Sequence, residues 1–533
     1  MESIIRYPDY IAVETEETRI ETMVTEPQFQ VGNICISMDD SGGSIAVYCR
    51  GGMEKIRMIQ LRWEMDIPVS TEFLGDAWER TYGDMGWQHL SPCRFMPWYF
   101  LAENEGNVFG YGVKVRPSAM CMWSADRKGI TLYLDVRCGG TGVCLNGRNL
   151  KAAEIVSEVY SGITAFQAAR KFCTVMCESP VLPDYPVYGS NNWYYAYGDS
   201  SAENIRKDAQ YLAKLTEGIE NRPYLVIDDG WQVNHRLDEY NGGPWRKSND
   251  KFTEMKELAD EIKQKDLHAG IWIRLLLNED PQIPDEWRLT HTGSLDPSHP
   301  KAQEYIKEDV KTICGWGYEL IKHDFSTFDI LGKWGFEMHP LVTEDGWHFY
   351  DESKTTAEVI VDFYQLIWDT ALPSKTLILG CNTIGHLGAG LMQMNRTGDD
   401  ISGYVWERTR KMGVNTLAFR MPQHGSFYDI DADCVGIDGS IDWKYNEQWS
   451  RLLAKSGTSL FLSVKPDILT EDEEQTVREL FKTASLKHVP AVPCDWKYTD
   501  CPQRWAFDDS VLDFEWNEKL GTGYRTEPFV SGV

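Results

Sequence analysis

From Pro186 onward, the chain alternates short apolar runs with longer stretches of helical periodicity. Eight of these apolar runs are rich in β-branched residues, which fits strands buried on both faces of a parallel sheet. Eight strand-then-helix units in about 300 residues are what a (β/α)8 barrel requires, whereas an open doubly wound sheet would not need eight. We therefore predict an α/β barrel with strands at 187–194, 224–228, 269–273, 319–323, 376–380, 391–397, 416–421 and 458–464.

Two β-rich regions flank the predicted barrel. Before it, short β-like runs such as 45–49 and 130–134 alternate with glycine-containing turns, which indicates an antiparallel β-sandwich. Three prolines within 178–186 disfavour both helix and central strand, so this segment is the expected linker. We predict an N-terminal β-sandwich domain at 1–180, the barrel at 181–488, and a small C-terminal β region at 489–533.

The charge balance excludes several classes of partner. The chain has 53 Lys and Arg against 81 Asp and Glu, a net charge of −28, and such a field repels phosphate backbones and anionic lipids. No run approaches the roughly 20 apolar residues that cross a bilayer. Residues 1–17 lack the basic start and apolar run of a signal peptide. We expect no nucleic-acid or membrane partner and a cytoplasmic location.

The cysteines do not indicate a metal site. They are 13, an odd number, and they are scattered along the chain, which suits reduced thiols. Neither Cys173 with Cys177 nor Cys138 with Cys144 has the C-x2-C spacing of common zinc sites, and no histidine pair accompanies them. We therefore predict buried, unreactive thiols, with no metal and no cofactor.

Polar residues follow several predicted strands at the end where barrels of this kind carry their active sites. Each has an ordinary alternative role, because Asp-Gly forms turns, lysine pairs with aspartate, and aspartate caps helices. Many charged side chains gathered at one end of the barrel would repel one another, which costs free energy unless they serve a function. This argues for an active site at that end of the barrel. The residues are Trp193, Asp228, Asp229, Trp231, Trp272, Arg274, Lys322, Asp324, Cys381, Asn382, Arg396 and Asp400.

Glycoside hydrolysis is the chemistry that such a site suits. It needs one ionised carboxylate and one protonated carboxyl, which two different strands can supply. A separation of roughly 5 Å would give retention of anomeric configuration, and a wider one would give inversion.

These motifs resemble the α-galactosidase families 27 and 36 of the glycoside hydrolases, with the closest likeness to a short family 36 enzyme. The likeness spans roughly 186–485 and, more loosely, the sandwich. It implies that Asp324 is the nucleophile, that Lys322 touches the sugar, and that Asp400 is the acid/base, because Arg396-Thr-Gly-Asp-Asp400 has the spacing of the family segment. This spacing favours Asp400 over Asp399.

The resemblance also implies sugar contacts. Asp228, Asp229 and Trp231 match a segment that binds the 4- and 6-hydroxyls, Trp193 matches a pocket tryptophan, and Cys381-Asn382 matches a fifth-strand segment. The third strand departs from the family pattern, since Trp272 and Arg274 stand where a Glu-Pro-Glu segment is usual. Arg274 could therefore bring a positive charge near the pocket for an acidic substrate. A further segment, 75–80, resembles a loop that reaches toward the pocket.

The sequence therefore predicts a retaining hydrolase that cleaves terminal α-linked galactose from oligosaccharides or glycosides. In this mechanism Lys322 keeps Asp324 ionised, and the neighbours of Asp400 keep it protonated. The alternatives are an α-N-acetylgalactosaminidase, a β-L-arabinopyranosidase, a raffinose-type galactosyl transferase, or a non-catalytic sugar-binding protein. The expected partner is a carbohydrate, and formation of a homo-oligomer stays open. The sequence gives no clear role to His323, His424, Asp431 and Asp433.

Overall fold

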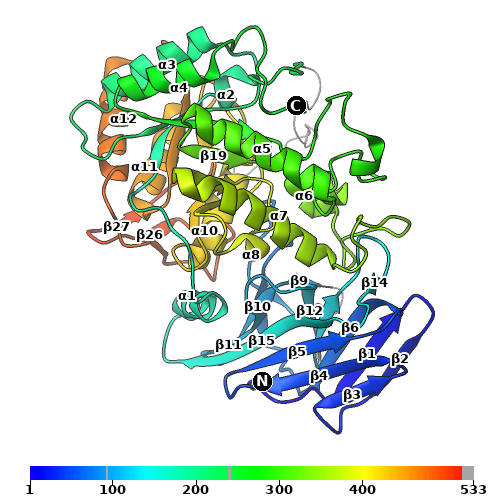
Figure 1. The fold of residues 1–533 in the computed structure, drawn as a ribbon. Coiled ribbons are helices and arrows are strands. Elements are labelled where there is room, and N and C mark those ends of the chain that lie inside the picture. The colour runs from blue at the N-terminus through cyan, green and yellow to red at the C-terminus, as the bar shows by residue number, and fades with distance from the viewer. Residues whose placement is uncertain (92–93, 238–241, 519–533) are drawn as a thin grey trace.

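The computed structural model describes residues 1–91, 94–237 and 242–518. Its N-terminal part contains two antiparallel sheets, drawn in blue to cyan in Figure 1. In the described ranges, one sheet has seven strands: β2 (Arg19–Met23), β1 (Tyr10–Thr15), β6 (Lys55–Glu64), β13 (Gly129–Asp135), β12 (Met120–Asp126) and β9 (Met96–Pro97), with β14 (Val143–Cys144) beside β6. The other has eight: β3 (Gln28–Val31), β4 (Ile34–Asp40), β5 (Ser44–Arg50), β15 (Asn149–Ser161), β11 (Asn107–Val113), β10 (Tyr99–Asn104), β7 (Glu72–Gly75) and β8 (Gln88–His89).

Aromatic side chains pack between these two sheets. Trp123 on β12 contacts Phe100 on β10 of the other sheet, with ring centroids 5.8 Å apart, and lies 6.2 Å from Trp63 on β6. All three rings are fully buried. Burial of a large apolar side chain contributes about 1.5–3 kcal/mol, so these three rings help to stabilise the sandwich.

A parallel sheet with helices on its outer side follows in the chain (Figure 1). In the described residues its order is β22 (Asp429–Asp431), β21 (Met394–Arg396), β20 (Leu377–Gly380), β19 (Leu320–His323), β18 (His268–Ile273), β17 (Tyr224–Ile227), β16 (Tyr188–Asn191), β24 (Leu460–Val464) and β23 (Cys434–Ile437). Seven of the eight predicted strands overlap strands of this sheet. The two end strands, β22 and β23, are separated in the chain only by Ala432 and Asp433.

The predicted strand at 416–421 is wrong. Residues Thr416–Arg420 form a helix, α10, that continues a π-helical segment at Arg410–Asn415. Every residue of α10 is buried, and a short, wholly buried apolar run has no period that distinguishes strand from helix. The strands at this place in the sheet are β22 and β23, whose stretch contains three aspartates, a residue type that is depleted in strands.

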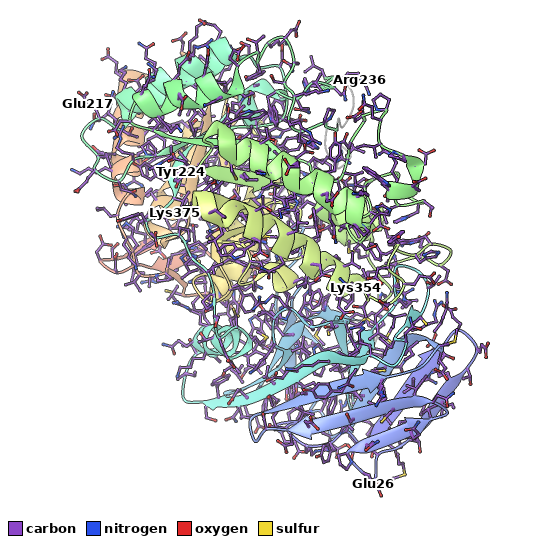
Figure 2. The ribbon with its side chains drawn as sticks, in the orientation of Figure 1. Glu26, Glu217, Tyr224, Arg236, Lys354 and Lys375 are labelled. Carbon is purple, nitrogen blue, oxygen red and sulfur yellow. The ribbon has the colours of Figure 1, made fainter. Side chains whose placement is uncertain are left out.

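Long helices cover the outer side of the parallel sheet: α3 (Ala202–Leu215), α4 (Met255–Gln264), α5 (Pro300–Trp316), α7 (Thr356–Ala371), α11 (Trp443–Ser456) and α12 (Glu471–Ala484). Their ends carry the expected signals. Thr355 forms a capping box with Glu358 at the start of α7, and Gly317 ends α5 in the left-handed region. Exposed charged residues such as Glu217 and Lys375 project from the connections between elements (Figure 2).

Short helices follow the carboxyl ends of several parallel strands: α2 (Trp193–Ala196), α6 (Ser326–Leu331), α8 (Gly385–Gly388) and α9 (Trp406–Thr409). Helix α1 (Ala165–Met176) and the irregular segment 178–186 link the sandwich to the parallel sheet. After the parallel sheet, the chain forms a small antiparallel sheet from β25 (Val492–Pro493), β26 (Arg504–Ala506) and β27 (Val511–Asp513). Part of the predicted C-terminal β region, 519–533, lies outside the described residues. None of the helices in the described ranges is long and apolar enough to cross a membrane.

Candidate active site

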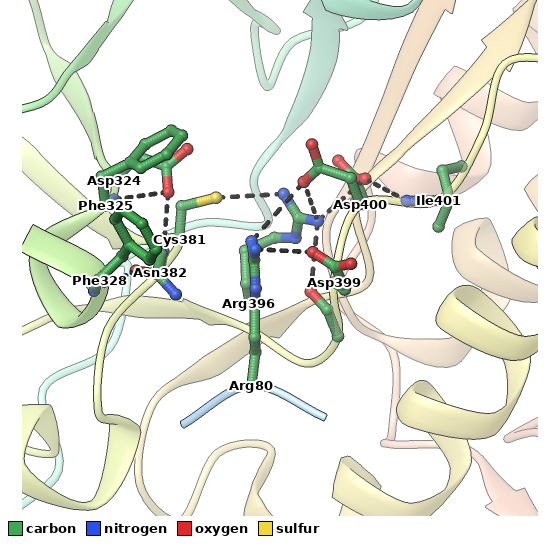
Figure 3. Close-up of polar contacts among 12 residues, drawn as sticks. Arg80, Asp324, Phe325, Phe328, Cys381, Asn382, Arg396, Asp399, Asp400 and Ile401 are labelled. Atoms are coloured by element: carbon green, nitrogen blue, oxygen red, sulfur yellow. Dashed lines mark hydrogen bonds and ion pairs between the residues drawn. The ribbon is translucent and has the colours of Figure 1, made fainter. Parts of the chain in front are cut away.

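The carboxyl ends of the parallel strands bring together side chains from segments that are distant in the sequence. Asp324 follows β19, Cys381 follows β20, and Asp400 lies four residues beyond the end of β21. Figure 3 shows Asp324 and Asp400 on opposite sides of this region, with Cys381 and Arg396 between them. We refer to this region as the mouth of the sheet.

Asp324 is held by N–H donors. Its Oδ1 accepts hydrogen bonds from the backbone N–H groups of Phe325 at 2.7 Å and Asn382 at 3.1 Å, and its Oδ2 accepts one from Trp272 Nε1 at 2.9 Å. Phe325 has a φ of 60°, which turns the chain sharply from β19 into α6. Three N–H donors stabilise a carboxylate. Trp272 therefore has an orienting contact with the expected nucleophile.

Lys322 has a different partner from the one predicted. Its Nζ lies 2.7 Å from Asp228 Oδ2, and Asn191 Nδ2 donates to the same oxygen at 2.6 Å. Burial raises the pKa of Asp228, and the charge of Lys322 opposes that shift. The expected pairing of Lys322 with Asp324 is therefore wrong, because Lys322 pairs with Asp228 and the hydrogen bonds to Asp324 come from N–H donors.

Asp400 lies among arginines. Its Oδ1 is 3.2 Å from Arg396 and 3.7 Å from Arg80, while 40% of its side chain is exposed. Burial alone would raise the pKa of Asp400, but the positive charges, chiefly those of Arg396 and Arg80, outweigh it and lower the pKa to about 2. The prediction that its neighbours keep Asp400 protonated is wrong for the unliganded protein.

The neighbouring Asp399 has both oxygens occupied by ion pairs. Arg80 lies 2.6 Å from one oxygen and Arg408 lies 2.9 Å from the other. Only 12% of its side chain is exposed, against 40% for Asp400. Of the two aspartates, Asp400 is thus the one that a ligand can reach.

A segment of the sandwich takes part in this region. Thr81 pairs with the backbone after β21, since its N–H donates to the Thr397 carbonyl at 3.0 Å and its carbonyl accepts from Asp399 N–H at 2.9 Å. This places Arg80 against Asp399 and places the buried Glu79 against Asn382. In the sequence, the likeness of 75–80 to a family loop is what pointed to this segment. A further signal is the pair of adjacent charged residues, Glu79 and Arg80, between Trp78 and Thr81.

Asp433 is a second residue to which the sequence gave no role. It lies 2.9 Å from Arg396, accepts from Ile401 N–H at 3.0 Å, and also bonds the Tyr194 hydroxyl. Its φ of 74° is unusual for an aspartate and comes in the short break between β22 and β23. Arg396 in turn donates to Cys381 Sγ at 3.2 Å. These contacts fix the guanidinium that faces Asp400.

The predicted sugar-binding residues Trp231 and Arg274 lie within the protein core and contact other protein groups. Trp231 has no exposed surface, packs edge-on against Trp245 and Trp316, and donates to the Trp272 carbonyl at 2.9 Å. Arg274 is 4% exposed and pairs with Asp329, with 2.6 Å between the nearest atoms. The charge of Arg274 is therefore balanced inside the protein, which removes the reason to expect an acidic substrate.

This buried ion pair leads to a stability prediction. Arg274→Met should destabilise the protein by about 3–5 kcal/mol, because Asp329 is 2% exposed and would lose its charged partner. Urea unfolding measures the change. Replacing Asp329 with Leu in the same chain should restore most of the loss. An Arg274→Met protein as stable as the wild type would contradict this account of the pair.

Aromatic side chains flank the mouth near Asp400. The ring of Tyr197 lies 5.5 Å from that of Trp193 and 6.2 Å from that of Tyr404, which is 52% exposed. Asp229, beside Asp228, accepts from Gln232 at 2.6 Å. Flat rings beside hydroxyl-binding groups suit the CH faces of a sugar.

The two histidines to which the sequence gave no role are uncharged. Burial lowers the pKa of both His323 and His424 to about 4 and keeps them neutral.

Together the fold and the site have two carboxylates in different environments at the carboxyl end of a parallel α/β sheet, an arrangement suited to glycoside chemistry. Comparisons with known proteins agree with this class. No protein-family model matches the sequence. An α-galactosidase of rice, Oryza sativa subsp. japonica, is 28% identical over 142 residues, which cover 26% of this chain and only 29% of that protein.

Solved structures of α-galactosidases share the fold. One from Thermus thermophilus, in complex with p-nitrophenyl α-D-galactopyranoside, has a TM-score of 0.62 at 14% identity, over 92% of this chain and 99% of that one. A family 36 enzyme from Geobacillus stearothermophilus, in complex with 1-deoxygalactonojirimycin, has a TM-score of 0.60 at 15% identity, over 94% of this chain and 79% of that one. The resemblance to α-galactosidases that the motifs indicated is thus confirmed.

Proposed function

We propose that this chain is a retaining glycoside hydrolase that releases terminal α-linked galactose from oligosaccharides or glycosides. The observation that carries the proposal is the unequal setting of two carboxylates that face one mouth (Figure 3). Asp324 is bound by three N–H donors and is 8% exposed, whereas the side chain of Asp400 is 40% exposed and lies beside two arginines. The similarity to galactosidases bound to galactose-like ligands supports the choice of sugar.

We also infer that the parallel sheet closes into an eight-stranded barrel. The two ends of its strand order, β22 and β23, are consecutive in the chain, so together they would form one broken strand that joins β21 to β24. In this architecture the sandwich spans 1–180, the catalytic barrel spans 181–488, and the C-terminal β region spans 489–533. A closed barrel would place the ends of β19 and β21 around a common axis, as the mechanism requires.

In the proposed mechanism Asp324 attacks the anomeric carbon and forms a glycosyl-enzyme, while Asp400 donates a proton to the leaving oxygen. Asp400 then takes a proton from the water that releases the sugar. The Asp228–Lys322 pair and Asp229 would bind hydroxyl groups of the galactose, and Trp193 would contact its apolar face.

The low pKa of Asp400 gives a pH prediction. The unliganded protein holds this carboxylate ionised above about pH 2, so the free enzyme lacks the acid form over most of the pH range. A bound sugar excludes water and weakens ionisation, which raises the pKa in the complex. The basic limb of the kcat profile should therefore lie at higher pH than that of kcat/KM, which reports the free enzyme.

Substitution of Arg80 tests the electrostatic cause. Arg80→Gln removes one of the charges that lower the pKa of Asp400, so the basic limb of kcat/KM should move to higher pH. Arg206→Gln, which changes a surface ion pair with Glu261, is the matched control and should leave the profile unchanged. Coincident limbs for kcat and kcat/KM, or no response to Arg80→Gln, would contradict this assignment.

A panel of aryl α- and β-glycosides tests the function itself. We expect turnover of aryl α-galactoside, and NMR of the fresh product should show the α-anomer of galactose first. Initial release of the β-anomer would mean inversion and would exclude Asp324 as a nucleophile. Faster turnover of an N-acetylgalactosaminide or a β-L-arabinopyranoside would replace galactose with that sugar.

A further inference from the structure

Glu79 is a buried carboxyl group at the junction of the sandwich and the mouth. It belongs to the segment after β7, yet its side chain is fully buried against residues that follow β19 and β20. Its Oε1 accepts a hydrogen bond from Gly335 N–H at 2.7 Å and another from the Tyr82 hydroxyl, and its Oε2 accepts one from Asn382 Nδ2. The two oxygens thus accept from three donors, one of which belongs to the segment after β20.

Asn382 connects this carboxyl group to Asp324. Its backbone N–H donates to Asp324 Oδ1 at 3.1 Å, and its side-chain Oδ1 accepts from Phe328 N–H at 3.0 Å. The carbonyl of Asn382 also accepts from Ser326 Oγ at 3.0 Å. Since Oδ1 is occupied by Phe328, the amide group must direct its Nδ2 toward Glu79. Every polar group of Asn382 is therefore hydrogen-bonded, and among the described residues Glu79 is its hydrogen-bond partner from the sandwich.

We propose that Glu79 is a positioning residue for Asp324, which acts by holding Asn382 so that its backbone N–H points at the nucleophilic carboxylate. The proposal rests on the proposed function, because it assigns Asp324 the attack on the sugar. It gives the sandwich a role in the reaction without contact between Glu79 and the substrate. Displacement of reacting groups by about 1 Å can cost on the order of 100-fold in rate, so such a contact can matter for catalysis.

The substitution Glu79→Gln changes the hydrogen bonding of this side chain and leaves its size nearly unchanged. Glutamine fills the same volume but has one oxygen, and its NH2 group would face either Gly335 N–H or Asn382 Nδ2. Rotation of the Asn382 amide cannot relieve the conflict without loss of the bond from Phe328 N–H. One donor is therefore left unpaired in a buried place, and we expect Asn382 to shift.

Steady-state kinetics on aryl α-galactoside should show kcat lowered on the order of 10- to 100-fold by Glu79→Gln, with KM little changed. The matched control is Glu337→Gln, in the turn that also contains Gly335. Glu337 is exposed and accepts from Trp334 N–H at 2.9 Å. Its substitution should leave kcat unchanged. Equal kcat values for Glu79→Gln and wild type would overturn the proposal.

A double substitution tests the route through Asn382. If Glu79 acts by way of Asn382, then Glu79→Gln should lower kcat no further in a protein that already carries Asn382→Ala. Independent, multiplicative losses would overturn this route. Should Glu79→Gln fail to fold, Tyr82→Phe removes one donor to the same carboxyl group and should lower kcat by a few-fold with KM unchanged; an unchanged kcat would count against the proposal.

Hydrogen exchange gives a readout that does not need activity. The amides of Phe325 and Asn382 both donate to Asp324 Oδ1, and both should exchange faster in Glu79→Gln than in Glu337→Gln. A purely structural role would instead lower the unfolding midpoint and leave exchange at these two amides unchanged. If the wild type hydrolysed no α-glycoside, the proposed function would fail, whereas the exchange comparison would still decide whether Glu79 positions Asp324.

Discussion

Replacement of Asp324 by asparagine should lower kcat on aryl α-galactoside by roughly 10⁴-fold or more while the protein stays folded. The neutral amide cannot attack the anomeric carbon. It is close in size to the carboxylate, and its oxygen can still accept from the backbone N–H groups of Phe325 and Asn382. The amide NH2 takes the place of Oδ2, so the hydrogen bond from Trp272 Nε1 is the one that is lost. Turnover, measured per folded molecule, and the unfolding midpoint together provide the test.

The matched control is Asp429→Asn, the same chemical change at the amino end of β22. Burial raises the pKa of Asp429 to about 7, so at neutral pH this group is already partly uncharged, and its replacement should leave kcat unchanged. Near-normal turnover by Asp324→Asn would remove this residue from the nucleophile role.

Replacement of Asp400 by alanine should have an effect that depends on the leaving group. A poor leaving group needs a proton, and general acid catalysis contributes roughly 10²–10⁴-fold, so kcat/KM on oligosaccharides should fall by that factor. A dinitrophenyl leaving group needs no proton, so kcat/KM on that galactoside should change little. Azide should then accelerate turnover, because a small anion can replace the water that Asp400 no longer activates.

Asp399→Ala distinguishes Asp400 from its neighbour. Asp399 pairs with Arg80 and Arg408, so its loss should lower stability without creating a dependence on the leaving group. Equal losses on good and poor leaving groups for Asp400→Ala, with no response to azide, would contradict the acid/base assignment.

The parts of the fold that the sequence predicts well are those where a local pattern has one interpretation. The run Tyr224–Ile227 is apolar, β-branched and followed by Asp-Asp-Gly, so a buried strand and its end could both be predicted. The stretch that contains β22 and β23 could not, because its aspartates are stabilised by partners such as Arg396 and Ser459 that only the folded chain brings near. The sequence predicts a strand at the wholly buried helix α10 for a related reason, because burial on all sides leaves no hydrophobic periodicity.

The same distinction holds for the site. Asp228, Asp324 and Asp400 follow strands, and Lys322 lies near the end of β19. Strand ends alone therefore predicted that these residues would lie near one another. Their pairing could not be predicted, because whether Lys322 meets Asp228 or Asp324 depends on side-chain directions. Glu79 and Arg80 lie far from the other site residues in the sequence, in a different sheet region, and no local signal links them to Asn382 or Asp399.

The central claim is that Asp324 forms a covalent bond with the sugar, and a trapped intermediate tests it most directly. A fluorinated galactosyl fluoride slows release of the glycosyl-enzyme, so that the adduct accumulates and proteolysis with mass spectrometry can locate it. We predict one added sugar per chain, on the peptide that contains Asp324, and none in Asp324→Asn. An adduct on another residue, or full turnover of the wild type without any adduct, would contradict the account.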